Sequence, residues 1–237
     1  MKPSDWVPQA MTYAFGLGGV ARSVILRGET YLSPAKLKRL EQAIRDVDRA
    51  AVPGDVMEFG VARGGSAIVL AHHAKRSARR FVGFDVFSQI PAPNPAYDDE
   101  KSMKRFASIA SGVSKGIRGG KYYGYEENLY ELVMSLFDRY GLPATGNEIC
   151  LEKGLFEDTV PKYHDARVAM AHVDCDWYEP VAYCLEYLCD RLAPGGVIVL
   201  DDYNDYGGCR SAVDQFRTTR PHFEFEVGPN VILRKGL

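Results

Sequence analysis

The chain has 237 residues, 46% hydrophobic and 25% charged, a composition that fits one sizeable α/β domain with an appendage. The formal net charge of −2 at pH 7 gives no basic surface for phosphates, so no nucleic-acid partner is expected. The five cysteines include no Cys-x-x-Cys pair and MKPSDWVPQA lacks the apolar core of a signal peptide, so we expect reduced thiols, no membrane partner and a cytoplasmic location.

Residues 1–50 are predicted to form an arm and a helical cap. Residues 1–30 show no clean hydrophobic period and contain several glycines, so we expect an irregular arm, which is compatible with a homodimer whose arm reaches its neighbour. Ser33 and Pro34 then supply a helix N-cap and a first helical residue. Apolar residues at spacings of three and four follow, and they predict one buried helix face.

The stretch Val56–Leu70 predicts a short buried strand, a glycine turn and the start of a helix. Gly60 and Gly64 allow the tight turn and close backbone approach that a cofactor requires at the carboxyl end of a strand. Ser66 is the predicted N-cap of the helix. The spacing after Glu58 departs from the G-x-G-x-x-G of dinucleotide-binding folds. A glycine-rich turn without a ligand is the alternative interpretation.

A second predicted strand, Phe81–Phe84, ends at Asp85. An acid about 20 residues after the glycine turn is placed to accept hydrogen bonds from ribose hydroxyls, and an Asp that only caps the next turn is the alternative. Residues 91–125 are predicted to be a long, irregular, lid-like insertion. Its tyrosines at 122, 123 and 125 are expected either to stack on a substrate or to lie in a solvated loop.

Two further strands end in acids: Val168–Val173 is followed by Asp174, and Val197–Leu200 by Asp201 and Asp202. The carboxyl ends of parallel strands form the ligand-binding edge of an open α/β sheet. Several carboxylates in one crevice repel each other unless they are protonated or bind a metal. Oxygen ligands favour Mg²⁺, Mn²⁺ or Ca²⁺ over zinc, and simple capping by the last two acids is the alternative.

Asp176 and Glu179 lie three residues apart at the start of a predicted helix. This spacing is typical of a capping box, so Asp176 is assigned a structural role. His172 lies in mid-strand and is predicted to be a packed core histidine rather than a base. Residues 223–233 predict a β-hairpin, because an alternating strand, a Gly-Pro-Asn turn and another strand follow one another.

Three of these motifs occur in the same order in the macrocin O-methyltransferase family, which the chain resembles from about Ser33 to Phe216. They are EFGVARGGS at 58–66, HVD and DWYE within 172–179, and PGG and DDY within 194–203. Members of that family are class I S-adenosylmethionine-dependent enzymes that tailor antibiotic sugars. The resemblance implies a Rossmann-like α/β methyltransferase fold over residues 51–237, with a mainly parallel seven-stranded sheet, a carboxy-terminal β-hairpin and the N-terminal helical cap.

The resemblance also implies S-adenosylmethionine as cofactor, with its methionine part held by the glycine loop. The implied cofactor-binding residues are Glu58, Gly60, Val61, Arg63, Gly64, Ser66, Asp85 at the ribose, Phe156 beside the adenine, and Asp174. Asp174, Asp201 and Asp202 would bind Mg²⁺, and Asp174 is the candidate proton acceptor. The expected acceptor is a small hydroxylated molecule, a sugar or glycosylated natural product in antibiotic biosynthesis.

Two other functions agree with parts of the sequence. A nicotinamide-dependent oxidoreductase would use a similar sheet edge, but the glycine spacing and the crowded acids disfavour it. A non-catalytic cofactor-binding protein would not require three aspartates of the kind that bind metals. We therefore expect a metal-dependent O-methyltransferase that acts on a hydroxyl of a sugar or another vicinal diol.

Overall fold

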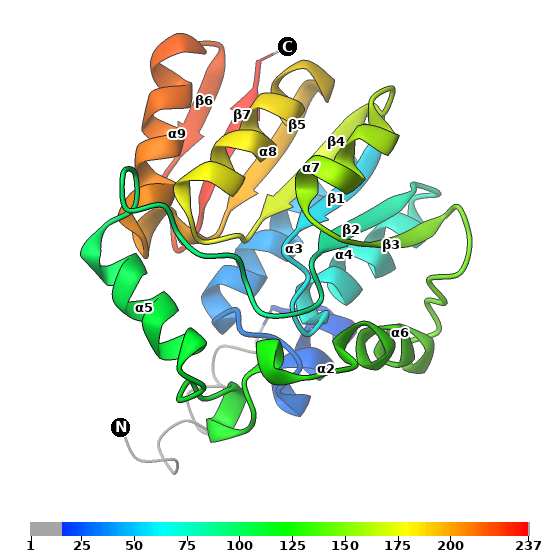
Figure 1. The fold of residues 1–237 in the computed structure, drawn as a ribbon. Helices are drawn as coiled ribbons and strands as arrows, with labels where there is room; N and C mark the ends of the chain where they lie inside the picture. The colour runs from blue at the N-terminus through cyan, green and yellow to red at the C-terminus, as the bar shows by residue number, and fades with distance from the viewer. Residues whose placement is uncertain (1–15, 237) are drawn as a thin grey trace.

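A seven-stranded sheet runs through the centre of the computed structural model, which describes residues 16–236 (Figure 1). The strands are β1 (Asp55–Phe59), β2 (Phe81–Asp85), β3 (Ile149–Lys153), β4 (Val168–Val173), β5 (Leu192–Leu200), β6 (Phe223–Glu226) and β7 (Val231–Lys235). Their order is β3-β2-β1-β4-β5-β7-β6, and only the pairs made by β7 are antiparallel. The predicted Rossmann-like sheet and its carboxy-terminal hairpin are confirmed.

Helices cover both faces of this sheet (Figure 1). On one face lie α2 (Gly19–Arg27), α3 (Pro34–Arg49), α4 (Gly65–Arg76) and α6 (Leu129–Arg139), and on the other lie α7 (Phe156–Thr159), α8 (Tyr178–Arg191) and α9 (Gly207–Thr219). Neighbouring residues of β1, such as Val56 and Met57, enter different cores, because side chains alternate across a strand. Short 3₁₀ turns occur at Ile117–Gly119, Tyr123–Tyr125, Val160–Tyr163 and Asp202–Asn204.

The cap helix α3 begins as predicted. The Ser33 side chain accepts a hydrogen bond from the Lys36 amide, and Pro34 is the first helical residue. The buried face of α3 packs against α4 and against β4 and β5. The helix α3 therefore packs directly against the two strands whose ends carry the predicted metal ligands.

The prediction of an irregular arm was wrong for residues 19–27, which form α2. Its glycines lie at the helix ends rather than inside it: Gly18 is the N-cap and Gly28 is a left-handed C-cap with a φ of 68°. Such positions favour glycine and define a helix without adding to its hydrophobic period. The arm before residue 16, and with it the predicted contact to a second copy, lies outside the described residues.

The insertion at 91–125 contains a helix, α5 (Glu100–Ala110), where the sequence predicted irregular structure. The helix begins at Asp99, whose carboxylate accepts a hydrogen bond from the Ser102 amide at 2.8 Å. Asp99 also accepts one from the Gly207 amide of α9 at 3.0 Å. Trp177 Nε1 donates to the Pro91 carbonyl at 3.0 Å. The first part of the insertion is thereby tied to the starts of α8 and α9.

Within residues 16–236, no helix is both long enough and apolar enough to cross a bilayer.

Glu41 is a buried carboxylate of α3. It accepts hydrogen bonds from the Gly18 amide at 2.8 Å and from Arg45 at 2.9 Å, and it lies 3.3 Å from His73 Nε2. Burial raises its pKa, but these partners outweigh burial and lower the pKa to about 2. A carboxylate of this kind stabilises the fold above its unfolded-state pKa, and the stabilisation is lost as the pH falls toward the folded-state pKa.

We therefore expect Glu41→Gln to lower the free energy of unfolding by roughly 1–3 kcal/mol at pH 7 and by less at pH 3. Urea denaturation followed by circular dichroism at both pH values measures this. Asp46→Asn, which removes an exposed ion pair on the same helix, is the matched control and should cost less than about 1 kcal/mol. An equal penalty for Glu41→Gln at both pH values would contradict the assignment.

Candidate active site

A cavity of about 600 Å³ lies at the carboxyl edge of the sheet, where the chain order reverses between β1 and β4. Ligands of open α/β sheets bind at this kind of switch point. Six of the predicted site residues line the cavity: Gly60, Asp85, Phe156, Asp174, Asp201 and Asp202. The other five do not line it: Glu58, Val61, Arg63, Gly64 and Ser66.

Gly60 joins the glycine loop to the end of β4. Its backbone has a φ of 97°, and a Cβ at this position would lie 1.8 Å from the Asp174 carbonyl oxygen. The Asp174 amide donates to the Phe59 carbonyl at 2.8 Å, so the two strand ends are locked together here. Only glycine combines that conformation with that contact.

The helix after the glycine loop begins without a side-chain cap. Gly64, with a φ of 88°, is the N-cap of α4, and Ser66 is buried in the first turn. The prediction that Ser66 caps this helix was wrong, because the turn ends at the left-handed glycine before it. A Cβ on Gly65 would lie 2.4 Å from the Glu29 carbonyl oxygen, so the loop also packs closely against the N-terminal cap.

Asp85 holds two loops of the cavity wall. Its Oδ2 accepts a hydrogen bond from the Ala62 amide at 2.8 Å, and its Oδ1 accepts one from the Phe87 amide at 2.6 Å. Both donors have positive φ, 46° and 48°, a conformation that costs free energy in residues other than glycine. Each carboxylate oxygen has a second lone pair, so Asp85 can accept further hydrogen bonds from a ligand in the cavity.

Phe156 begins α7, just after the end of β3. Its ring lies edge-on to Phe59, with 5.6 Å between the ring centres. The exposed face of Phe156 lines the cavity next to Leu155, and this apolar wall is suited to a flat ring.

Glu58 and His172 form a buried pair beneath the cavity. They are opposite each other on β1 and β4, and Glu58 Oε1 lies 2.7 Å from His172 Nδ1. His172 is buried as predicted. Burial alone would lower its pKa, but Asp201 and Glu58 raise it to about 10. The two acids therefore favour the protonated form of His172.

Asp174, Asp201 and Asp202 come together at the ends of β4 and β5. One carboxylate oxygen of each lies within 4.8 Å of the others. Burial and the repulsion among these acids raise the pKa of Asp174 and of Asp202. Burial also acts to raise the pKa of Asp201, but His172 and Lys36 outweigh it and lower that pKa.

The three carboxylates fit a hard divalent cation. Asp201 Oδ1 is buried and has no hydrogen-bond partner among the described residues, although buried acceptors are usually satisfied. A cation between the three acids would satisfy this oxygen and remove their mutual repulsion. Oxygen donors are the ligands that Mg²⁺ and Ca²⁺ prefer.

Asp176 is a site residue that the sequence interpretation missed. It does not cap α8, because Trp177 is the N-cap and the Tyr178 amide donates to Asp98 Oδ1 at 2.9 Å. Asp176 instead adopts a φ of 61° and lines the cavity. Burial raises its pKa to about 6 against the opposing effect of Arg105. The available signal was its position two residues after Asp174, which a capping-box spacing explained equally well.

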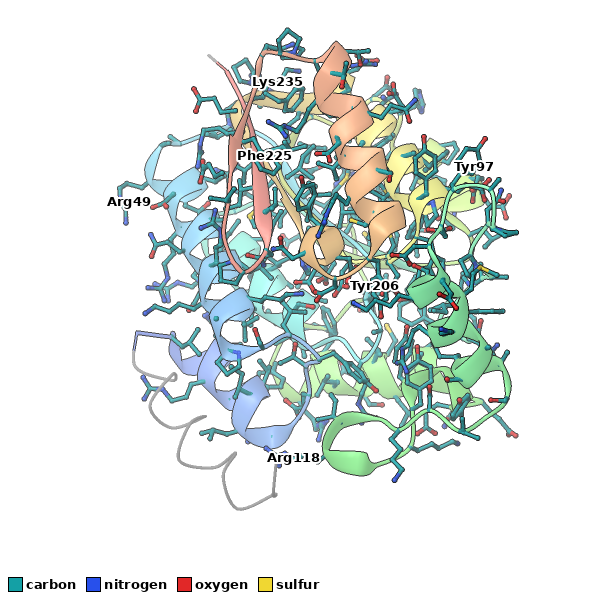
Figure 2. The ribbon with its side chains drawn as sticks, turned by 90° about the vertical axis from the view of Figure 1, so that its left-hand side faces the viewer. Arg49, Tyr97, Arg118, Tyr206, Phe225 and Lys235 are labelled. Carbon is teal, nitrogen blue, oxygen red and sulfur yellow. The ribbon has the colours of Figure 1, made fainter. Side chains whose placement is uncertain are left out.

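Tyrosines close the side of the cavity away from the sheet. Tyr122 is buried, and its ring centre lies 4.5 Å from that of Tyr123 and 6.4 Å from that of Tyr31. All three line the cavity, so Tyr122 and Tyr123 belong to its wall rather than to a solvated loop. Tyr206, labelled in Figure 2 at the start of α9, faces α5 and also lines the cavity, with Lys101 Nζ 5.0 Å from its ring centre.

Comparison with known proteins gives one family and several relatives. Residues 24–223 match the family described as macrocin-O-methyltransferase (TylF). The 8-demethyl-8-(2,3-dimethoxy-alpha-L-rhamnosyl)-tetracenomycin-C 4'-O-methyltransferase of Streptomyces olivaceus is 31% identical over 192 residues, which cover 79% of this chain and 67% of the relative. The mycinamicin III 3''-O-methyltransferase of Micromonospora griseorubida is 28% identical over 194 residues, covering 79% and 70%.

The fold also has a solved counterpart. The structure of the O-methyltransferase NovP superposes with a TM-score of 0.71 at 25% sequence identity, covering 88% of this chain and 83% of that one. The similarity in fold therefore extends over most of this chain.

Gly60→Ala tests the contact between the glycine loop and Asp174. We expect a loss of roughly 3 kcal/mol or more in unfolding free energy, because strain and a clash with main-chain atoms add up. Gly141→Ala is the matched control: Gly141 also has a positive φ, 67°, but a Cβ there meets nothing within 4 Å, so only about 1–2 kcal/mol of strain is expected. Urea unfolding measures both, and equal losses would contradict the predicted contact.

Proposed function

This chain belongs to the macrocin O-methyltransferase family, and from that premise we propose that it methylates a hydroxyl of a sugar or glycosylated natural product with Mg²⁺ as a second cofactor. The family fixes the enzyme class as an S-adenosylmethionine-dependent O-methyltransferase. The observation that carries the proposal is the cluster of Asp174, Asp201 and Asp202 in the same cavity as the glycine loop.

The donor is expected to lie along the ends of β1 and β2. Gly60 lines the cavity at the turn after β1, Asp85 would accept hydrogen bonds from the ribose hydroxyls, and the Phe156 wall would border the adenine. A sulfonium is already an activated methyl donor, so the protein has mainly to hold donor and acceptor in line. Arg63 and Gly64 do not line the cavity. They would therefore affect binding of the methionine part only by setting the conformation of the glycine loop.

The acceptor is expected between the acids and the tyrosines. The chemistry that Mg²⁺ supplies when bound by the three aspartates is the polarisation of an acceptor hydroxyl, which makes it easier to deprotonate. Tyr122 and Tyr123 line the cavity, and a sugar ring would lie against the wall that they form. The name of the Streptomyces olivaceus relative includes a rhamnosyl group, which supports a glycosylated acceptor.

Two carboxylates of the cavity are candidates for proton acceptor. Asp174, the residue indicated by the sequence, is one of the three clustered acids. Asp176 lies outside that cluster, and its side chain makes no hydrogen bond to other described residues. A carboxylate that is not a metal ligand keeps its lone pairs for a proton, so Asp176 is the better placed of the two.

The double variant Asp201→Asn with Asp202→Asn tests the metal. We expect it to lose metal-dependent methyl transfer to a panel of rhamnosylated natural products and other vicinal diols, and EDTA should do the same to the native enzyme. Binding of S-adenosylhomocysteine, measured by calorimetry, should change less than threefold. Full turnover in the variant would exclude the metal role, and tighter binding of NAD than of S-adenosylhomocysteine would favour an oxidoreductase.

The variant Asp176→Asn tests whether the proton acceptor is a different residue from the metal ligands. We expect kcat to fall by roughly 10²–10⁴-fold, the usual contribution of a general base. Affinities for Mn²⁺ and for S-adenosylhomocysteine should stay within threefold of the native values. Asp174→Asn is the comparison and should weaken Mn²⁺ binding as well. A variant at Asp176 with native kcat would return the role of proton acceptor to Asp174.

A further inference from the structure

Lys36 is a half-buried lysine in the first turn of α3, far in sequence from the acids it contacts. Its Nζ donates to Asp201 Oδ2 at 2.7 Å, to the Asp201 carbonyl at 2.9 Å and to Asp205 Oδ2 at 2.7 Å. An ammonium group has three N–H donors, so all of them are used. The acceptors belong to Asp201 and Asp205, which lie before and after Asp202. Lys36 therefore holds together the two ends of the turn that follows β5.

This contact gives the two oxygens of Asp201 different surroundings. Lys36 occupies Oδ2, whereas Oδ1 is buried without a hydrogen-bond partner. On the other side, His172 Nε2 lies 4.0 Å from Oδ1, and the Glu58 carboxylate holds the His172 ring at 2.7 Å. Asp201 thus lies between two basic side chains, and its Oδ1, although it faces His172 at 4.0 Å, makes no hydrogen bond to another described residue and can still accept a ligand.

We propose that Lys36 is a positioning residue of the metal site, which fixes the turn carrying Asp201 and Asp202 and presents Oδ1 of Asp201 to the cation. The inference rests on the proposed Mg²⁺ site. It makes the N-terminal helical cap part of the catalytic apparatus, because α3 supplies the restraint. Residues that orient metal ligands from behind commonly change metal affinity 10–100-fold when they are replaced.

A simpler role for Lys36, that of a counter-ion for crowded acids, makes the opposite prediction. An ammonium group this close to the ligands repels a divalent cation. If charge were its only contribution, its removal would tighten metal binding. A positioning role requires that removal weakens metal binding in spite of the more negative cluster, so the sign of the change separates the two roles.

The test is a Mn²⁺ titration of the full chain, saturated with S-adenosylhomocysteine and followed by electron paramagnetic resonance. Mn²⁺ suits the site because it takes oxygen ligands. We expect Lys36→Met to weaken Mn²⁺ binding at least tenfold. Lys36→Arg keeps the charge but replaces the ammonium by a planar fork, so it should also weaken binding. Lys38→Met, the same substitution at an exposed position of α3, is the control and should have no effect.

Affinity for S-adenosylhomocysteine, measured on the same samples, reports whether each variant is folded and should stay within threefold of the native value. Unchanged or tighter Mn²⁺ binding in Lys36→Met would overturn the inference while leaving the proposed function intact. If that variant does not fold, native Mn²⁺ affinity in Lys36→Arg would overturn it instead. A native protein without measurable Mn²⁺ affinity would overturn both the inference and the proposed metal site.

Discussion

The contact between Gly60 and the Asp174 carbonyl is the constraint on which the rest of the site depends. Because no side chain fits between them, the loop after β1 and the end of β4 approach as closely as two backbones can. A ligand on the glycine loop is thereby placed next to the first of the clustered acids. The proposed donor and metal sites would therefore lie side by side in one cavity.

The second constraint is electrostatic. Six aspartates line the cavity, and four of them, at 174, 176, 201 and 202, follow the ends of β4 and β5, where burial makes their charges costly. Two basic side chains, the buried His172 and the half-buried Lys36, lie next to Asp201 and lower its pKa. The other three of these four acids have raised pKa values in the absence of a cation. The Mg²⁺ proposed above would relieve the repulsion among these acids.

The features predictable from the sequence are those with local signals. The strands, the Ser33 cap and the acids at the strand ends follow from short patterns, and they define the sheet edge. The roles of Asp176 and Lys36 do not, because they depend on partners that are distant in the chain. Asp98, 80 residues from Tyr178, replaces Asp176 as the cap of α8, and Lys36 meets Asp201 across 165 residues. No local pattern encodes either contact.

The central claim is that the methyl donor and the metal bind at the same edge of the sheet. Its most direct test is a crystal structure of the full chain with S-adenosylhomocysteine and Mn²⁺, in which anomalous diffraction locates the metal. The account predicts an anomalous peak between Asp174, Asp201 and Asp202, and S-adenosylhomocysteine along the glycine loop with its ribose at Asp85. Bound S-adenosylhomocysteine with no peak between these aspartates, or with the peak elsewhere in the molecule, would contradict it.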